Sequence, residues 1–205
     1  MHAWPSPNHA NNRLVRYSAR MLKNMAFRLL ALHGWSLTEP PDRPARAVLV
    51  AYPHTSNWDA LYALLAKLGL GLDARWVAKD ALFRWPFGGL LGRMGGIPVN
   101  RRERNGLVAG MVVRFAARPR LLLVVAPEGT RRRTEGWKSG FYRIALAANI
   151  PVVLGFVDYA RREAGILAYL TLTGDPAVDI AAIARHYVDR PGRHPALASP
   201  IRWLD

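Results

Sequence analysis

The stretch AVLVAYPHTSNWD, residues 47–59, marks the point where this chain passes from an expected strand to an expected helix. Ala47–Tyr52 is a short apolar run with the length of a buried strand. The polar residues after it offer a cap, Ser56 or Asn57, for a helix that we expect over Trp58–Leu70. A strand, a polar turn and a helix in direct succession form the building unit of an α/β domain.

The same alternation of apolar runs and helical stretches continues along the rest of the chain. It favours a single α/β domain with a largely parallel or mixed central sheet, flanked by helices and preceded by an N-terminal amphipathic helix. In such a domain the functional loops lie at the carboxyl ends of the strands. The further expected strands are Arg75–Ala78, Ile97–Val99, Leu121–Ala126, Val152–Val157 and Leu167–Leu172, and the further expected helices are Gly106–Ala117 and Ser139–Ala148.

Composition limits the number of domains and the chemistry. With 205 residues and 51% hydrophobic content the chain can bury one substantial core, and no linker-like stretch divides it. The sequence contains no cysteine, which excludes disulfides, thiolate nucleophiles and cysteine-based metal sites. No stretch of about 18 residues is free of charge, so no transmembrane helix is expected, and residues 1–12 lack the apolar run of a secretory signal. We expect residues 1–35 to form a tail and an amphipathic helix, and residues 36–205 to form the folded domain.

The amphipathic helix is expected over Arg13–Trp35. Its basic residues gather within an arc of roughly 140°, at about 100° per residue, and its apolar residues occupy most of the remaining circumference. That pattern is typical of a helix at a membrane interface, and a helix packed on the domain with a basic outer face is the alternative. The arc holds Arg13, Arg16, Arg20, Lys23, Asn24 and Arg28, and the apolar residues are Leu14, Val15, Met21, Leu22, Met25, Leu29 and Leu32.

His54 and Asp59 are the first candidates for chemistry. His54 lies just outside the N-terminus of the expected helix, and Asp59 lies in its first turn. A carboxylate at this spacing can accept a hydrogen bond from one imidazole nitrogen, and the other nitrogen is then free to act as a base. The alternative is a structural helix cap next to a surface histidine. No second histidine or carboxylate stands at ligand spacing from His54, so we expect no metal.

Two further loops carry arginines downstream of this turn. PEGTR, residues 127–131, follows an expected strand, and Gly129 permits a tight turn with exposed backbone N–H groups. Arg131 offers a planar fork that suits phosphate oxygens. GIPVNR, residues 96–101, ends a strand in Arg101. Together the two loops predict a basic pocket beside a base, and a charged surface loop is the alternative.

Four ordered blocks of this sequence resemble those of the glycerophospholipid acyltransferases, typified by 1-acylglycerol-3-phosphate acyltransferase. They are HTSNWD at residues 54–59, GIPVNR at 96–101, EGTR at 128–131 and IPVV at 150–153. The resemblance spans about residues 48–157, and its first and third blocks are the specific ones.

The resemblance implies that a fatty acyl group moves from an acyl thioester, acyl-CoA or acyl-carrier protein, to the hydroxyl of a lysophospholipid. His54 is then the general base, and Asp59 holds the imidazole in the right tautomer. No cofactor is expected beyond the acyl donor. The substrate-binding residues that the resemblance implies are Arg101, Glu128, Gly129, Thr130, Arg131 and Pro151.

Three positions depart from the common pattern of this family. Pro53 stands where an asparagine often precedes the histidine, and Arg132 stands where a serine often follows the third block. Leu154 stands where a second proline often sits in the fourth block. These departures leave the His/Asp chemistry intact but leave the acceptor open, so a lyso-aminolipid without glycerol phosphate is an alternative acceptor.

The formal net charge of +15 favours anionic partners. With the amphipathic helix and the resemblance, it predicts peripheral binding to an anionic membrane surface, at the cytoplasmic face of the inner (plasma) membrane. Acyl-carrier protein is a further expected partner. A non-catalytic basic protein that binds membranes or nucleic acid is the alternative from another class. We expect no nucleic acid, because the aromatic residues are not interleaved with the basic runs. A serine hydrolase is disfavoured because the sequence has no Gly-x-Ser-x-Gly elbow.

Overall fold

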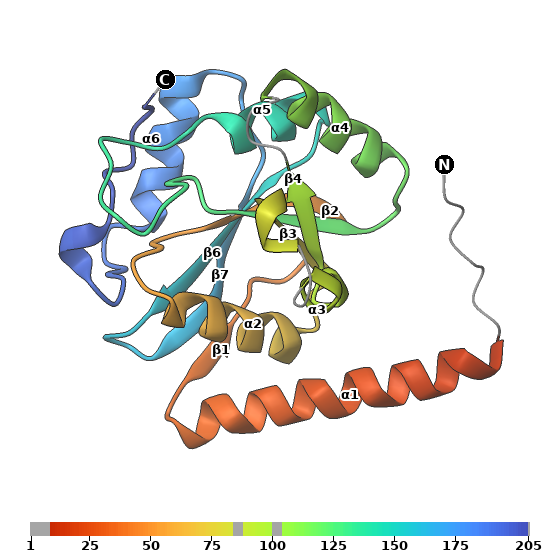
Figure 1. The fold of residues 1–205 in the computed structure, drawn as a ribbon. Coiled ribbons are helices and arrows are strands. Elements are labelled where there is room, and N and C mark those ends of the chain that lie inside the picture. Colours follow the sequence, from red (N-terminus) through yellow and green to blue (C-terminus); the bar gives the residue numbers. More distant parts are fainter. Residues whose placement is uncertain (1–8, 84–87, 100–103, 205) are drawn as a thin grey trace.

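The computed structural model describes residues 9–83, 88–99 and 104–204, which build one seven-stranded mixed sheet with helices on both sides (Figure 1). The strand order is β1-β7-β6-β2-β5-β3-β4. Neighbouring strands are parallel except for the β6–β7 pair, which is antiparallel. The strands are β1 (Ser36–Thr38), β2 (Arg46–Ala51), β3 (Ala74–Lys79), β4 (Gly96–Val99), β5 (Leu121–Val125), β6 (Val152–Asp158) and β7 (Glu163–Leu170). The predicted α/β class with a mixed central sheet is confirmed.

The two faces of the sheet bury different sets of side chains, as the alternation along β2 shows. Val48 and Val50 belong to the larger core, which also contains residues of α4, α5 and α6. Ala47 and Leu49 belong to a second cluster on the other face. Figure 1 shows α4, α5 and α6 on one side of the sheet, and α2 and α1 on the other. The helices are α1 (His9–Leu32), α2 (Trp58–Leu70), α3 (Gly88–Arg93), α4 (Arg104–Ala116), α5 (Gly140–Ala147) and α6 (Pro176–His186), with short 3₁₀ turns at Asp80–Phe83 and Pro195–Leu197.

The helix α2 has the bounds that the sequence predicts, Trp58–Leu70. Of the two expected caps, Ser56 is the one that bonds, because its hydroxyl oxygen accepts the backbone N–H of Trp58 at 3.2 Å. The side chain of Asn57 makes no capping bond. Gly71 ends the helix with a φ of +65°, a left-handed conformation that a glycine adopts at little cost. The turn that carries His54 therefore leads directly into a well-defined helix.

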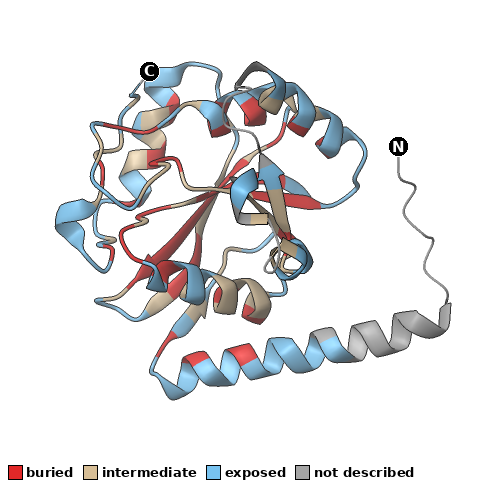
Figure 2. Cartoon of the chain, in the orientation of Figure 1, coloured by how far each residue is buried: buried red, intermediate tan, exposed pale blue. Residues whose placement is uncertain are grey.

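The predicted amphipathic helix is present as α1 and packs against α2 along a narrow stripe. Ala26 and Leu30 are buried there, each 1% exposed. In Figure 2 most of the coloured part of α1 is exposed. The part of the chain that the structure describes contains no helix of the length and hydrophobicity needed to cross a bilayer. Several apolar side chains of α1 remain uncovered by the domain: Met21, Leu22, Met25, Leu29 and Leu32.

Several elements differ from the sequence expectations. α1 spans His9–Leu32, whereas the sequence predicts Arg13–Trp35, and α3 lies where the sequence predicts no helix. β1 has only three residues, too few for a periodic pattern. The apolar patterns predict no helix at α6, although Asp175 caps it by accepting the backbone N–H groups of Ala177 and Val178. β7 begins at Glu163, four residues before the expected strand, because its pairing with β6 starts there.

Candidate active site

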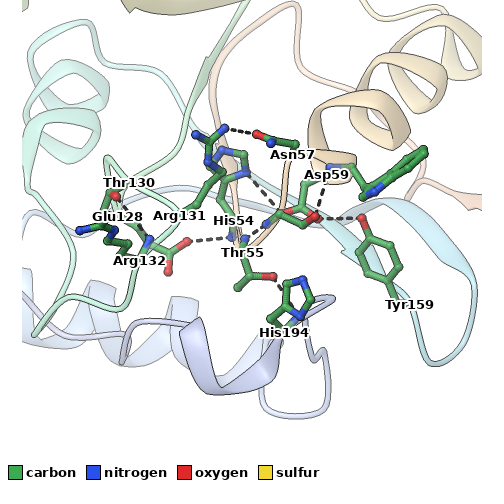
Figure 3. Close-up of polar contacts among 12 residues, drawn as sticks. His54, Thr55, Asn57, Asp59, Glu128, Thr130, Arg131, Arg132, Tyr159 and His194 are labelled. Atoms are coloured by element: carbon green, nitrogen blue, oxygen red, sulfur yellow. Dashed lines mark hydrogen bonds and ion pairs between the residues drawn. The ribbon is translucent and has the colours of Figure 1, made fainter.

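The carboxyl ends of β2, β5 and β6 meet at one edge of the sheet, and their loops carry most of the predicted site residues. β2 leads to His54 and Asp59, β5 leads to residues 128–131, and β6 leads to Tyr159. These loops are neighbours because β2 pairs in parallel with both β5 and β6. Figure 3 shows their side chains converging on the turn between β2 and α2.

His54 and Asp59 form the pair that their spacing predicts. His54 Nδ1 lies 3.4 Å from Asp59 Oδ2, and the two side chains are 27% and 6% exposed. The same carboxylate oxygen accepts the backbone N–H groups of Thr55 and Ser56, at 2.7 and 2.8 Å. The turn therefore places a partly exposed imidazole against a buried carboxylate.

The surroundings of Asp59 keep it ionised. Burial by itself raises the pKa of Asp59, but hydrogen bonds from His54, Tyr159 and two backbone amides outweigh it and hold the pKa below its usual value. An ionised carboxylate at Nδ1 favours the tautomer in which that nitrogen carries the proton. The second imidazole nitrogen, Nε2, is then the basic one.

Glu128 has a different position from the one expected of a substrate ligand. Its side chain is buried, with 1% of the residue exposed. One carboxylate oxygen accepts the backbone N–H of His54 at 2.8 Å, and the other accepts that of Ser199 at 2.9 Å. Burial raises the pKa of Glu128 more than these two hydrogen bonds lower it. Its carboxylate thus joins the loop after β5 to the backbone of two other loops, at His54 and at Ser199.

The PEGTR loop forms the tight turn that the sequence predicts. Gly129 has a φ of +66°, in the left-handed region. Arg131 is exposed, and its guanidinium donates to the side-chain oxygen of Asn57, within the turn that carries His54. Thr130 lies half-buried in the same loop. The structure therefore brings Thr130 and Arg131 together with the His/Asp turn (Figure 3), and Gly129 precedes them in the same loop.

One predicted substrate-binding residue, Pro151, does not join this group. Pro151 precedes β6, and its carbonyl oxygen accepts the backbone N–H of Val48 near the start of β2. It therefore lies at the end of the sheet opposite to His54, where it starts a buried strand and does not line the site. Arg101 lies outside the described residues.

Sequence patterns miss the residues that close the site from the C-terminal side. Tyr159 donates its hydroxyl to Asp59 Oδ1 at 2.7 Å. In the C-terminal segment 190–199, the backbone N–H of His194 donates to the hydroxyl oxygen of Thr55 at 3.2 Å. Tyr159 follows a predicted strand, so its place at the functional edge is a signal that could have found it. The segment 190–199 carries no motif and offers no such signal.

The described residues contain no group of three or more histidine, cysteine or acidic side chains placed to hold a metal ion. The groups at this edge can instead accept a proton at His54 and bind an anion at Arg131. Acid–base chemistry on an anionic substrate is the kind of reaction that this arrangement supports.

Comparison with known proteins adds two findings. Residues 36–153 match the model of the family described as Acyltransferase. The match covers more than half of the chain, and it includes the His/Asp turn at residues 54–59 and the PEGTR loop at residues 127–131. The solved structures include the 1-acyl-sn-glycerophosphate (LPA) acyltransferase PlsC from Thermotoga maritima. It aligns with a TM-score of 0.59 and 14% identity, over 88% of this chain and 83% of that chain, which shows a shared fold. No curated protein matches the sequence.

Proposed function

This chain belongs to the acyltransferase family, and we propose that it transfers a fatty acyl group from an acyl thioester to the hydroxyl of a lysophospholipid such as 1-acylglycerol-3-phosphate. The observation that carries the proposal is the His54–Asp59 pair at 3.4 Å, beside the exposed guanidinium of Arg131. A general base next to a phosphate-binding group suits an alcohol that bears a phosphate. PlsC, whose name states this acceptor class, has the same fold.

In the proposed reaction Nε2 of His54 takes the proton of the acceptor hydroxyl while the hydroxyl oxygen attacks the thioester carbonyl carbon. Asp59 accepts the Nδ1–H and stabilises the imidazolium that forms. The tetrahedral intermediate then collapses, the C–S bond breaks, and the leaving thiolate takes the proton back from His54. The products are the acylated lipid and a free thiol, and the reaction needs no enzyme nucleophile.

The phosphate of the acceptor is proposed to lie against Arg131 and the turn at Gly129. A guanidinium has five N–H donors, so the bond to Asn57 orients Arg131 and leaves donors for two phosphate oxygens. The N–H of Gly129 itself donates to the carbonyl oxygen of Ala126 at 3.0 Å, so the proposal relies on the Arg131 guanidinium rather than on that amide. Arg132, also exposed, adds a second positive charge to the loop.

We place the reaction at the surface of an anionic membrane, with the protein bound peripherally at the cytoplasmic face of the inner (plasma) membrane. The exposed apolar residues of α1 support this location, with Leu32 81% exposed and Met21 58% exposed. Lys23 and Arg28 on the same helix are exposed and favour anionic headgroups, at about 1 kcal/mol each. α1 packs on α2, the helix that carries Asp59, so an anchored α1 keeps the site close to lipid.

An acyl-transfer assay tests the proposal with the purified full chain. Labelled acyl-CoA or acyl-carrier protein is the donor, and the acceptors are lysophosphatidic acid, other lysophospholipids and a lyso-aminolipid, with products identified by mass spectrometry. We expect acylation of a phosphate-bearing lysolipid. Transfer to the lyso-aminolipid alone would show that the acceptor is a lyso-aminolipid and not a phosphate-bearing lysolipid. No transfer with either donor would overturn the proposal.

The variant His54→Ala tests the proposed base in the same assay. We expect turnover to fall by a factor of about 10² to 10⁴, because no other described group stands ready to take the proton. The matched control is His186→Ala, which removes an exposed histidine from the last turn of α6 and is expected to keep full turnover. Circular dichroism checks that both variants fold, and near-normal turnover in folded His54→Ala would reject the mechanism.

A further inference from the structure

Tyr159 lies just after β6, outside the residues that match the family model, and its phenol contacts the carboxylate of the proposed catalytic pair. Its hydroxyl donates a 2.7 Å hydrogen bond to Asp59 Oδ1, while Oδ2 faces His54 and two backbone amides. We propose that Tyr159 is a positioning residue. It fixes the orientation of the Asp59 carboxylate, and the carboxylate in turn orients the His54 imidazole. The proposal rests on the acyl transfer proposed above.

The bond from Tyr159 removes a freedom that the carboxylate otherwise has. The terminal torsion of an aspartate is broad, so a carboxylate held through one oxygen can turn away from its partner. Asp59 is 5% exposed, and little water reaches Oδ1 to replace the phenol. With both oxygens bound, the carboxylate plane is set before a substrate arrives.

The phenol itself is held by aromatic rings from two other parts of the chain. Trp35 and Tyr62 contact the Tyr159 ring edge to face, with centroids at 5.3 and 5.5 Å, and stack on each other at 4.0 Å. The guanidinium of Arg193 lies 5.7 Å from the centre of the Tyr159 ring. Trp35 follows α1 and Tyr62 belongs to α2, so the N-terminal helix and the site share one cluster.

Electrostatics keeps Tyr159 a donor. Burial and the neighbouring Asp59 carboxylate raise the pKa of the Tyr159 hydroxyl above its usual value, so it retains its proton at physiological pH. A neutral O–H that donates to a carboxylate makes a stronger bond than one that donates to a neutral oxygen. The orientation of Asp59 therefore depends on this phenolic proton at Oδ1 as well as on the amides at Oδ2.

The variant Tyr159→Phe tests the proposal because it keeps the ring and removes only the hydroxyl. We expect kcat to fall about tenfold, the loss expected for one hydrogen bond to a charged group, with the acceptor KM changing by less than about twofold. The matched control is Tyr169→Phe, which removes a 2.8 Å phenol-to-carboxylate bond to Glu39 elsewhere in the domain. It is expected to lower stability to a similar degree and to keep kcat.

A second variant and a spectrum separate positioning from folding. In the Asp59→Asn background, Tyr159→Phe should cause no further loss of kcat, since it acts through the carboxylate. Long-range ¹H–¹⁵N NMR of the neutral His54 imidazole, assigned with His54→Gln, should show Nδ1–H as the main tautomer in the wild type and a smaller share in Tyr159→Phe. Additive losses of kcat, or an unchanged share of the Nδ1–H tautomer in Tyr159→Phe, would overturn the proposal. If the wild type transfers no acyl group, the proposed function fails, and the spectrum still decides the role of Tyr159.

Discussion

At the residue scale, the carboxylate of Asp59 has two functions. Oδ2 caps the backbone N–H groups of Thr55 and Ser56, and it also faces Nδ1 of His54. Asparagine keeps one oxygen for the amides but lacks the charge that stabilises an imidazolium. Replacing Asp59 with asparagine should therefore disturb the catalytic chemistry more than the fold of the turn.

We expect Asp59→Asn to lower kcat by about 10² or more, with a smaller change in the acceptor KM. Initial rates over a range of acceptor concentrations separate the two constants. A folded variant whose kcat stays within about threefold of the wild type would show that Asp59 does not orient the base.

Arg131 is the second residue whose chemistry can be isolated. Arg131→Lys keeps the charge but loses the planar fork, so we expect the apparent acceptor KM to rise while the donor KM stays constant. The matched control is Arg118→Lys, at an exposed arginine just after α4, which should change neither constant. A change in the donor KM alone would indicate that Arg131 binds the acyl donor and not the acceptor.

At the element scale, α2 and the loop after β5 each bury one carboxyl group. The pKa values of these two groups are shifted in opposite directions. The pKa of Asp59 lies below its usual value because donors surround it. The pKa of Glu128 lies above its usual value because burial dominates over its two amide bonds. Asp59 thus stabilises the fold in its ionised form, whereas the ionisation of Glu128 costs stability.

These shifts predict opposite pH dependences of the free energy of unfolding. The stability that Asp59 contributes is present above about pH 4 and is lost as the pH falls through its lowered pKa. Between about pH 4.3 and its raised pKa, native Glu128 binds more protons than the unfolded chain does, so its contribution falls as the pH rises.

Urea unfolding of Asp59→Asn and Glu128→Gln over this range measures both contributions. The advantage of the wild type over Asp59→Asn should shrink toward acid, and its advantage over Glu128→Gln should shrink toward neutral pH. We also expect Glu128→Gln to lower the free energy of unfolding by about 1–3 kcal/mol, because the –NH₂ of glutamine cannot accept one of the two backbone N–H groups that the carboxylate accepts. Parallel pH dependences of the two variants would contradict the assigned shifts.

At the scale of the whole molecule, α1 connects the expected membrane surface to the domain. Leu30 and Trp35 are buried in the cluster that also contains Tyr159. Deleting residues 1–35 would therefore remove part of the support of the site along with any anchor. Substitution of the uncovered apolar side chains separates the two effects.

We expect the triple variant Met21→Gln, Met25→Gln, Leu32→Gln to bind anionic vesicles less than the wild type, because it loses apolar area that the domain does not cover. Wild-type binding should weaken with salt without vanishing, since salt screens only its electrostatic part. Val113→Gln on α4, 68% exposed on the other side of the sheet, is the control. Equal sedimentation of the triple variant and the wild type with vesicles would exclude α1 as the anchor.

Local patterns determined the parts of the fold and the site that depend on neighbours in the chain. The strand, turn and helix over residues 47–70 follow from apolar periodicity and a cap, and the turn at Gly129 follows from the freedom of a glycine backbone. The His54–Asp59 pair is local as well, because five residues across a helix start bring the two side chains within reach.

Only the tertiary structure decided the partners of these groups. Tyr159 meets Asp59 across 100 residues, and Ser199 meets Glu128 across 71. Pro151, in contrast, lies at the far end of the sheet although its block follows the others in order. Such placements depend on strand order and on which strand ends share an edge, and that order is set by packing of the whole sheet rather than by the residues adjacent in sequence.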